Sequence, residues 1–241
     1  MRAVARDAGL VRALGTWGLA ASIVSMIIGA GIFAVPSALA AAVGVDAPVA
    51  FLACGVAMGA VAVCFAEGGS RVPTSGGAYG YIEASLGPLT GYVCGTLLWV
   101  SDALASGGVA AAFADVVAGA TPLRLAALVR PAAIVGLVGA IALLNLGGVR
   151  RGAQLVGVAT AVKLVPLIAF VLVGASAVRG GNFAIHSAFS SADAGRALIL
   201  AMFALTGMEG SLCASGEVEQ PARTIPRAIA LALVAVTLLY L

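Results

Sequence analysis

Long apolar segments alternate with short charged ones along this 241-residue chain. No charged residue lies between Arg12 and Asp46, and none lies between Asp46 and Glu67. A helix needs about 20 mainly apolar residues to cross a bilayer, and charges interrupt this chain at about that interval. We therefore predict six membrane-spanning helices and part of a seventh, at residues 13–40, 46–66, 88–115, 131–149, 154–178, 196–216 and 226–241.

The connection between the second and third predicted spans is polar and rich in glycine. It runs from Glu67 to Glu83 and contains Gly68–Gly69 and Gly76–Gly77. Because glycine adopts backbone conformations that other residues avoid, we expect a flexible loop here. The segment lacks the Lys-Ser/Thr ending of a P-loop, so its glycines indicate no phosphate-binding site.

Composition places these helices in a membrane. Hydrophobic residues make up 62% of the chain and charged residues 10%, whereas a soluble domain is about 45–50% apolar and about 25% charged. We therefore expect an all-α polytopic membrane protein, with one transmembrane domain over residues 1–241 and the lipid bilayer as its surroundings. The net charge of +3 is slight and indicates no nucleic-acid partner.

The sequence also lacks the spacing of a metal site. The single His186 stands alone, and the four cysteines are expected to be free thiols because each lies in an apolar stretch without a CxxC pattern. These cysteines are Cys54, Cys64, Cys94 and Cys213. We therefore expect no bound metal and no cofactor.

The distribution of arginines predicts the orientation of the chain. Cytoplasmic flanks of membrane spans carry more Lys and Arg than external flanks. A cytoplasmic N-terminus puts eight arginines inside and four outside, and favours the plasma (inner) membrane as the location. The inner set is Arg2, Arg6, Arg12, Arg71, Arg150, Arg151, Arg223 and Arg227, and the outer set is Arg124, Arg130, Arg179 and Arg196.

Two predicted spans carry glycines near their middle. The first contains Gly29 and Gly31, and the sixth contains Gly207 and Gly210 on either side of Glu209. Glycine weakens a helix by about 0.8–1.0 kcal/mol relative to alanine, so each pair is either a helix break or a notch for close packing. Broken helices at membrane depth are tolerated where they line a cavity. Their free amides attract an anion and their free carbonyls a cation, so two such breaks suit a zwitterion.

Three ordered motifs resemble one superfamily of transporters. They are SMIIGAGIFAVPSALA at Ser25–Ala40, FAEGGSRVPTSGGAYGYIEASLGPLTGYVCGTLLW at Phe65–Trp99 and FALTGMEGSLCASGEVEQPARTIPRAI at Phe203–Ile229. They are similar to helix one, the region of helices two and three, and helix six of the amino acid–polyamine–organocation superfamily, closest to its basic amino acid/polyamine antiporter and cationic amino acid transporter branches. The resemblance implies a fold of two inverted five-helix repeats. This chain would hold the first repeat, helix six and part of helix seven, with helices one and six broken.

The same resemblance implies a binding site for an amino acid or a related amine. The matching positions are Ala30, Gly31 and Ile32 for backbone amides on the substrate carboxylate, and Phe203, Ala204 and Thr206 for carbonyls on its amino group. Phe203 also matches the aromatic side chain that covers the substrate. The implied activity is secondary transport by alternating access, as proton-linked symport or as exchange, and not enzymatic catalysis.

Three ionisable residues lie within predicted spans, and each is a functional candidate because charge is costly in a membrane. Glu209 matches the superfamily's sixth-helix acid, so we interpret it as a gating or proton-coupling residue or as a helix-packing hydrogen bond. Lys163 is similar in position to a lysine that occupies the sodium site of some relatives, which favours proton coupling, with a structural cation as the alternative. Asp102 is a candidate partner of Lys163 or part of a polar patch near the substrate.

The chain is short for this superfamily, whose members usually have about twice as many spans. Apolar residues continue to Tyr240 and Leu241 without a charged flank, so we expect a truncated or frame-shifted product. The alternative function is a non-transporting membrane subunit or remnant that needs another chain. An intramembrane hydrolase is disfavoured because Ser22 and Ser25 have no evident base nearby. The identity of the substrate and the oligomeric state, a homo-oligomer included, stay open.

Overall fold

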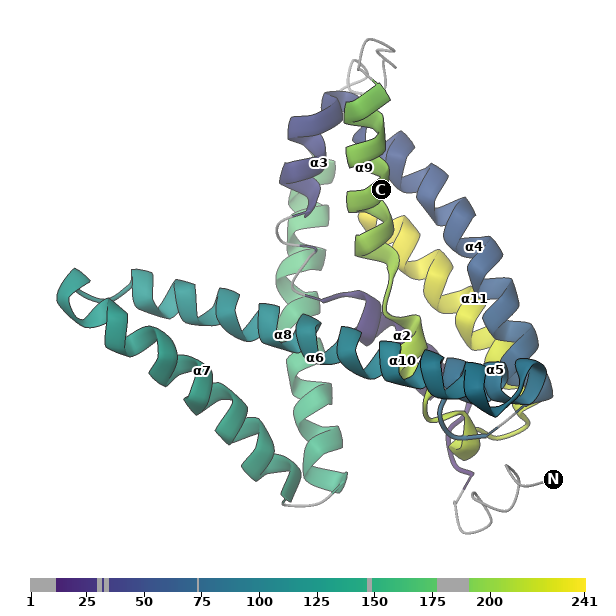
Figure 1. Cartoon of the computed structure of the whole chain (residues 1–241). Coiled ribbons are helices and arrows are strands. Elements are labelled where there is room, and N and C mark those ends of the chain that lie inside the picture. Colours follow the sequence, from purple (N-terminus) through teal and green to yellow (C-terminus); the bar gives the residue numbers. More distant parts are fainter. Residues whose placement is uncertain (1–11, 30–31, 33–34, 73, 147–148, 177–190) are drawn as a thin grey trace. The chain divides into compact units, whose positions relative to one another are not determined.

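The computed structural model describes residues 12–29, 32, 35–72, 74–146, 149–176 and 191–241 (Figure 1). These residues form α-helices joined by short turns, so the predicted all-α fold is confirmed. The chain divides into two compact units, Met1–Gly95 with Val178–Leu241, and Thr96–Ala177. Each unit is described by itself.

The first unit contains both of the glycine-bearing spans, and each of them consists of two helices. Its helices are α2 (Thr16–Ile27), α3 (Val35–Val43), α4 (Ala47–Arg71), α5 (Ala78–Leu86), the start of α6 (Pro88–Gly119), α9 (Ser191–Leu205), α10 (Met208–Leu212) and α11 (Pro221–Tyr240). Two 3₁₀ turns, η2 (Gly44–Asp46) and η4 (Ser215–Glu217), join α3 to α4 and follow α10.

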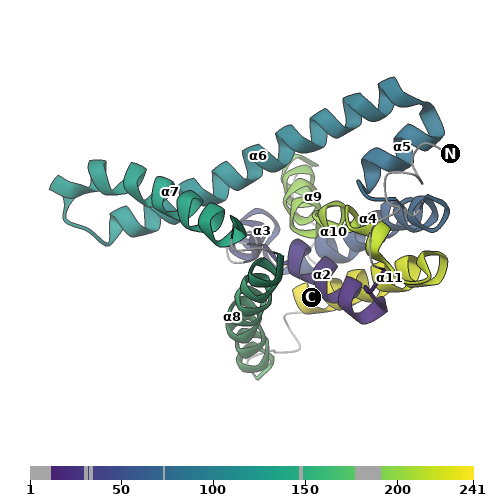
Figure 2. The ribbon, with the colours of Figure 1, turned by 90° about the horizontal axis from the view of Figure 1, so that it is seen from below.

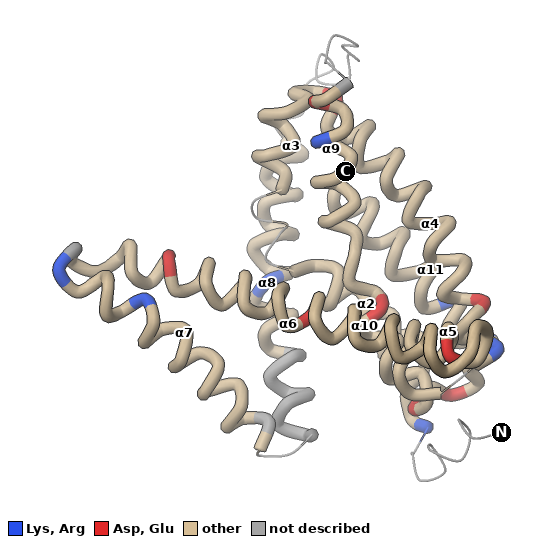
Figure 3. The backbone as a smooth tube through the Cα atoms, in the orientation of Figure 1, with Lys and Arg blue, Asp and Glu red and all other residues tan. Residues whose placement is uncertain are grey.

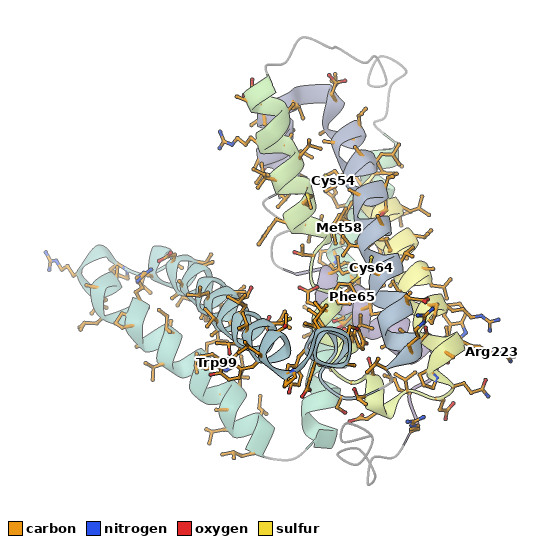
Figure 4. All side chains as sticks on the ribbon, turned by 45° about the vertical axis from the view of Figure 1, so that its right-hand side comes forward. Cys54, Met58, Cys64, Phe65, Trp99 and Arg223 are labelled. Carbon is orange, nitrogen blue, oxygen red and sulfur yellow. The ribbon has the colours of Figure 1, made fainter. Side chains whose placement is uncertain are left out.

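Several helices of the first unit pack directly against one another. α11 packs against α4 and α2, α4 also packs against α9, and α10 packs against α2 (Figure 2). The buried positions of α4 recur at Phe51, Cys54, Met58 and Ala62, which is the spacing of one helical face. The Cys54 thiol lies between α4 and α9 and donates to the Leu198 carbonyl at 3.4 Å (Figure 4).

The connection after the second span is shorter than the expected flexible loop, and it keeps only Gly76 and Gly77 outside the helices. α4 continues to Arg71, and α5 forms within the polar stretch. Gly68 and Gly69 are helical residues that leave room for Tyr81 of α5: a Cβ on Gly68 would lie 2.8 Å from its Cδ2, and a Cβ on Gly69 2.9 Å from its hydroxyl. Phe65, on the same face of α4, meets the Tyr81 ring edge-on at a centroid distance of 6.5 Å. These glycines therefore provide a slot for an aromatic side chain.

The second unit contains the rest of α6, α7 (Leu123–Leu146) and α8 (Val149–Ala175). α7 begins well before residue 131, because Arg124 and Arg130 do not end the helix as their charge had suggested. The Arg130 Nε donates to Asp115 Oδ1 at 2.6 Å across the α6–α7 hairpin. The carboxylate of the neighbouring helix therefore neutralises the charge of Arg130. Most of the large apolar side chains described on these three helices are exposed.

Length and composition make five helical segments of the described chain candidate membrane spans. They are Val35–Arg71, Pro88–Gly119, Arg124–Leu144, Val158–Ala175 and Pro221–Tyr240. α2, with 12 residues, and α9, with 15, are too short to cross alone because each is one part of an interrupted span. Acidic and basic positions are absent from α3 and from the middle of α4 (Figure 3), as expected for helices in hydrocarbon.

Candidate functional site

Two helix interruptions form the centre of the candidate site. α2 ends at Ile27 and α3 begins at Val35. At the first of these ends the Gly29 amide donates to the Ile27 carbonyl at 2.8 Å, and Ile28 has φ −75° and ψ 77°, which are the angles of an inverse γ-turn. The second interruption lies between Leu205 and Met208. The first adjoins Gly29 and the second contains Gly207, two of the four glycines at which the sequence predicted breaks.

The second interruption depends on one glycine. Gly207 has φ 120° and ψ −10°, a conformation that side-chain-bearing residues rarely adopt. A Cβ at this position would lie 3.0 Å from the Met26 carbonyl oxygen and 3.4 Å from the Ile27 Cα. The backbone of the sixth span at its break therefore touches the last residues of α2. The two interruptions are neighbours in space, although about 180 residues separate Ile27 from Gly207 in the sequence.

Two further contacts join α10 to α2. The Ser22 hydroxyl donates to the Ser211 hydroxyl oxygen at 3.1 Å. The sequence predicted Gly210 as part of the break, but this residue lies within α10. A Cβ there would lie 2.5 Å from the terminal methyl of Met26, which means that Gly210 instead permits close packing of α10 against α2.

Glu209 is the acidic group nearest to the second interruption. Its carboxylate oxygen Oε2 accepts a hydrogen bond from the Gly207 amide at 3.1 Å, and the residue is half-buried. The sequence marked this acid as functional, but only the structure shows that it caps the helix that follows the break. A carboxylate at this end is also favoured by the dipole of the helix it caps.

One backbone carbonyl at each break already accepts hydrogen bonds from other groups of the chain. The Phe203 carbonyl accepts from the Thr206 hydroxyl at 2.8 Å and from the Thr206 amide at 3.4 Å. The Phe203 side chain is exposed, and Ala204 is buried. The Ile27 carbonyl accepts from the Gly29 amide and from the Tyr240 hydroxyl, the latter at 3.4 Å. Sequence reasoning missed Tyr240, since nothing local relates the end of α11 to the end of α2.

The remaining predicted site residues are only partly located. Ala30 and Gly31 lie outside the described residues, and Ile32 is buried. Asp102 is exposed on α6 and Lys163 is half-buried on α8, both in the second unit. Their predicted roles in proton coupling stay predictions. Among the residues that the structure describes, no group of three or more His, Cys, Asp and Glu could hold a metal ion.

A second set of contacts, at the end of the first unit where α2 begins, holds the segments around α10. Leu14 pairs with Val218 through backbone hydrogen bonds, of which the Glu219 amide to the Leu14 carbonyl measures 3.0 Å. The Gly76 amide donates to the Cys213 carbonyl at 3.0 Å. These contacts tie the segments on either side of α10 to the beginning of α2 and to the α4–α5 connection.

The buried hydroxyl pair of Tyr81 and Ser215 lies in the same set of contacts, with its oxygens 2.8 Å apart. The Ser215 hydroxyl donates its one hydrogen to the Leu212 carbonyl at 2.5 Å. The Tyr81 hydroxyl must therefore be the donor to Ser215. Burial raises the pKa of the Tyr81 phenol above its ordinary value.

Comparisons with known proteins place this arrangement in a family. The family model described as "Amino acid permease" matches residues 14–241. Relatives include an uncharacterized transporter of Mycobacterium tuberculosis (strain ATCC 25618 / H37Rv), 29% identical over 90% of this chain and 51% of its own length. The methylthioribose transporter of Bacillus subtilis (strain 168) is 27% identical over 100% of this chain and 56% of its own length. The serine/threonine exchanger of the same organism is 26% identical over 98% and 54%.

The chain spans about half the length of the curated relatives it matches. The match nevertheless covers nearly the whole of this chain, including α2, the second interruption and α10. The chain belongs to the amino acid permease family.

Proposed function

We propose that this chain takes part in the secondary transport of amino acids or related amines by alternating access, as proton-linked symport or as exchange. The observation that carries the proposal is the contact of Gly207 with Met26 and Ile27, which brings two helix interruptions together. Amides and carbonyls at such a junction suit the two charges of a zwitterion. A relative named as a serine/threonine exchanger supports an amino acid as the substrate.

In this proposal the substrate carboxylate binds backbone amides near Ala30, Gly31 and Ile32. The amino group binds carbonyls of the segment Phe203–Thr206, with the Phe203 ring covering the substrate. Because the Phe203 carbonyl now accepts from the Thr206 hydroxyl, the ammonium group must displace that hydroxyl on binding. Thr206 is therefore part of the site both as a backbone group and as the side chain that occupies it before binding.

Glu209 is proposed to link substrate binding to the movement of α10. Its hydrogen bond to the Gly207 amide holds the break in shape when the carboxylate is charged. Protonation replaces a charge-assisted acceptor with a neutral one, which weakens this bond and frees the break to rearrange. Lys163 and Asp102 are proposed to carry protons in the second unit, with the N-terminus in the cytoplasm and the chain in the plasma membrane.

We expect Glu209→Gln to lower uptake of radiolabelled amino acids into proteoliposomes by about tenfold to a hundredfold, because a hydrogen bond to a charged group contributes about 1.5–3 kcal/mol. Glu219→Gln is the matched control, since Glu219 is exposed and lies outside the two interruptions. Equal uptake by the two variants and the unchanged chain would count against the proposed role of Glu209. The same assay is run with radiolabelled methylthioribose. Preferential uptake of methylthioribose over amino acids would contradict an amino acid substrate.

A second candidate function is a membrane subunit that transports only together with another chain. It is favoured by the exposed apolar faces of α6, α7 and α8. Co-expression with the C-terminal half of the B. subtilis serine/threonine exchanger tests it. Uptake that appears only in the presence of that half would favour the subunit, and uptake by this chain alone, or as a homo-oligomer, would exclude it.

A further inference from the structure

An apolar groove of about 570 Å³ lies on the first unit, between the first turn of α2 and the face of α11. It is lined by Thr16, Trp17, Arg227, Ala230, Leu231 and Val234. Its lining combines small and branched apolar residues with one aromatic ring and one cationic group. Trp17 is 77% exposed, so the indole is available to whatever occupies the groove.

Arg227 lies inside a membrane-spanning helix. It follows Pro221, the first residue of α11, by six positions, which corresponds to about 9 Å along the helix axis. Near a membrane interface an arginine is favoured where its guanidinium reaches polar groups or meets an anion. In the part of the chain that the structure describes, the ion pairs join Arg71 to Glu67 and Arg130 to Asp115, and none includes Arg227.

Among the described residues, the other charged groups near this end of the first unit do not line the groove. Arg12 precedes α2, Glu217 and Glu219 lie beside Leu14, and Arg223 extends from the first turn of α11 (Figure 4). Arg227 is therefore the charged residue among those that line the groove, which also include a tryptophan of the kind that marks the membrane interface. The distribution of arginines predicts that this end is cytoplasmic, where anionic lipids concentrate.

We propose that this groove binds one anionic phospholipid, with its phosphate on Arg227 and an acyl chain along Ala230, Leu231 and Val234. The charge of the guanidinium selects the headgroup, and the apolar wall of α11 accepts the chain. The bound lipid contacts α2, whose other end forms the first helix interruption. This site is independent of the proposed transport function, because it requires neither a substrate nor the second half of a transporter.

Fluorescence quenching by brominated lipid tests the proposal in the full chain. Trp17 and Trp99 are the two tryptophans, so Trp99→Phe leaves Trp17 as the only indole. This variant is placed in phosphatidylcholine vesicles that contain either brominated phosphatidylglycerol or brominated phosphatidylcholine. We expect the apparent affinity for the brominated anionic lipid to exceed that for the zwitterionic lipid by about fivefold, the contribution of one arginine near an anionic surface.

Two charge variants assign the preference to Arg227. Arg227→Gln removes the charge from the groove and is expected to abolish the preference, whereas Arg223→Gln removes a charge from the same helix outside the groove and is expected to retain it. Arg227→Lys keeps the charge and should keep most of the preference, which separates loss of charge from misfolding. Size-exclusion chromatography checks each variant.

Three results would overturn the proposal. Equal quenching by both lipids would mean that Trp17 meets only bulk lipid. Absence of quenching would mean that protein covers the groove, either another segment of the transporter or a second copy of the chain. A headgroup preference that survives Arg227→Gln would place the anion elsewhere. Transport plays no part in these measurements, so their outcome is separate from the test of the proposed function.

Discussion

Gly207→Ala is expected to lower the unfolding temperature of the detergent-solubilised chain by roughly 2–10 °C, because a strained backbone position costs about 1–3 kcal/mol. The φ of 120° at this position is unfavourable for alanine, and the new Cβ would lie 3.0 Å from the Met26 carbonyl oxygen. That oxygen belongs to the backbone of α2, so it cannot move aside as a flexible side chain could. Thermal unfolding followed by size-exclusion chromatography measures the effect.

Gly59→Ala is the matched control for this substitution. Gly59 lies within α4, and a Cβ there has no neighbouring atom within 4 Å. Alanine at such a helical position stabilises by about 0.5–1 kcal/mol, so the unfolding temperature should rise. If Gly207→Ala also raised it, or left it unchanged, the contact between the two interruptions would be wrong.

Ser215→Ala is expected to destabilise the fold by about 1–3 kcal/mol, the cost of a buried donor without an acceptor, and Tyr81→Phe by about 0.5–1.5 kcal/mol, the value of one lost hydrogen bond. The double variant should cost less than the sum of the single ones, because the Tyr81 hydroxyl donates to Ser215. Denaturant unfolding of all four forms measures this coupling. Additive losses would show that the two hydroxyls do not interact.

The burial of Tyr81 predicts a dependence of stability on pH. Burial raises the pKa of Tyr81 above its ordinary value of 10.0. In the unfolded chain the phenol ionises near pH 10, whereas in the folded chain it is still protonated there, so its contribution is complete below pH 10 and is lost as the pH rises through the higher folded pKa. Tyr81→Phe should remove this part of the alkaline decline. An unchanged pH profile in that variant would show that Tyr81 is not the group responsible.

The helix interruptions could be predicted from the sequence because their signals are local. Gly29 and Gly207 each lie within an apolar run long enough to span a membrane, and glycine is the residue that weakens a helix there. The all-helical fold followed from the lengths of the apolar runs. The polarity of two such breaks suggested one zwitterionic substrate, and the contact of Gly207 with Met26 brings the two breaks together.

Other features depended on contacts that no local pattern contains. Gly68 and Gly69 suggested flexibility, but they are small because the Tyr81 ring occupies the space beside them. Arg130 suggested the end of a span, but Asp115 of the preceding helix pairs with it. The caps at the breaks, such as Tyr240 on the Ile27 carbonyl, join residues far apart in the chain. Such pairings become visible only after the helices have packed.

Equilibrium binding in lipid nanodiscs tests the central claim most directly. The labelled probe is the amino acid that the chain takes up most strongly, and the competitors are its unlabelled form, its amino alcohol and its N-acetyl derivative. If the two interruptions hold a carboxylate and an ammonium group, removal of either charge should weaken binding by about tenfold to a hundredfold, since each charged hydrogen bond contributes about 1.5–3 kcal/mol. Equal competition by all three compounds would contradict the account.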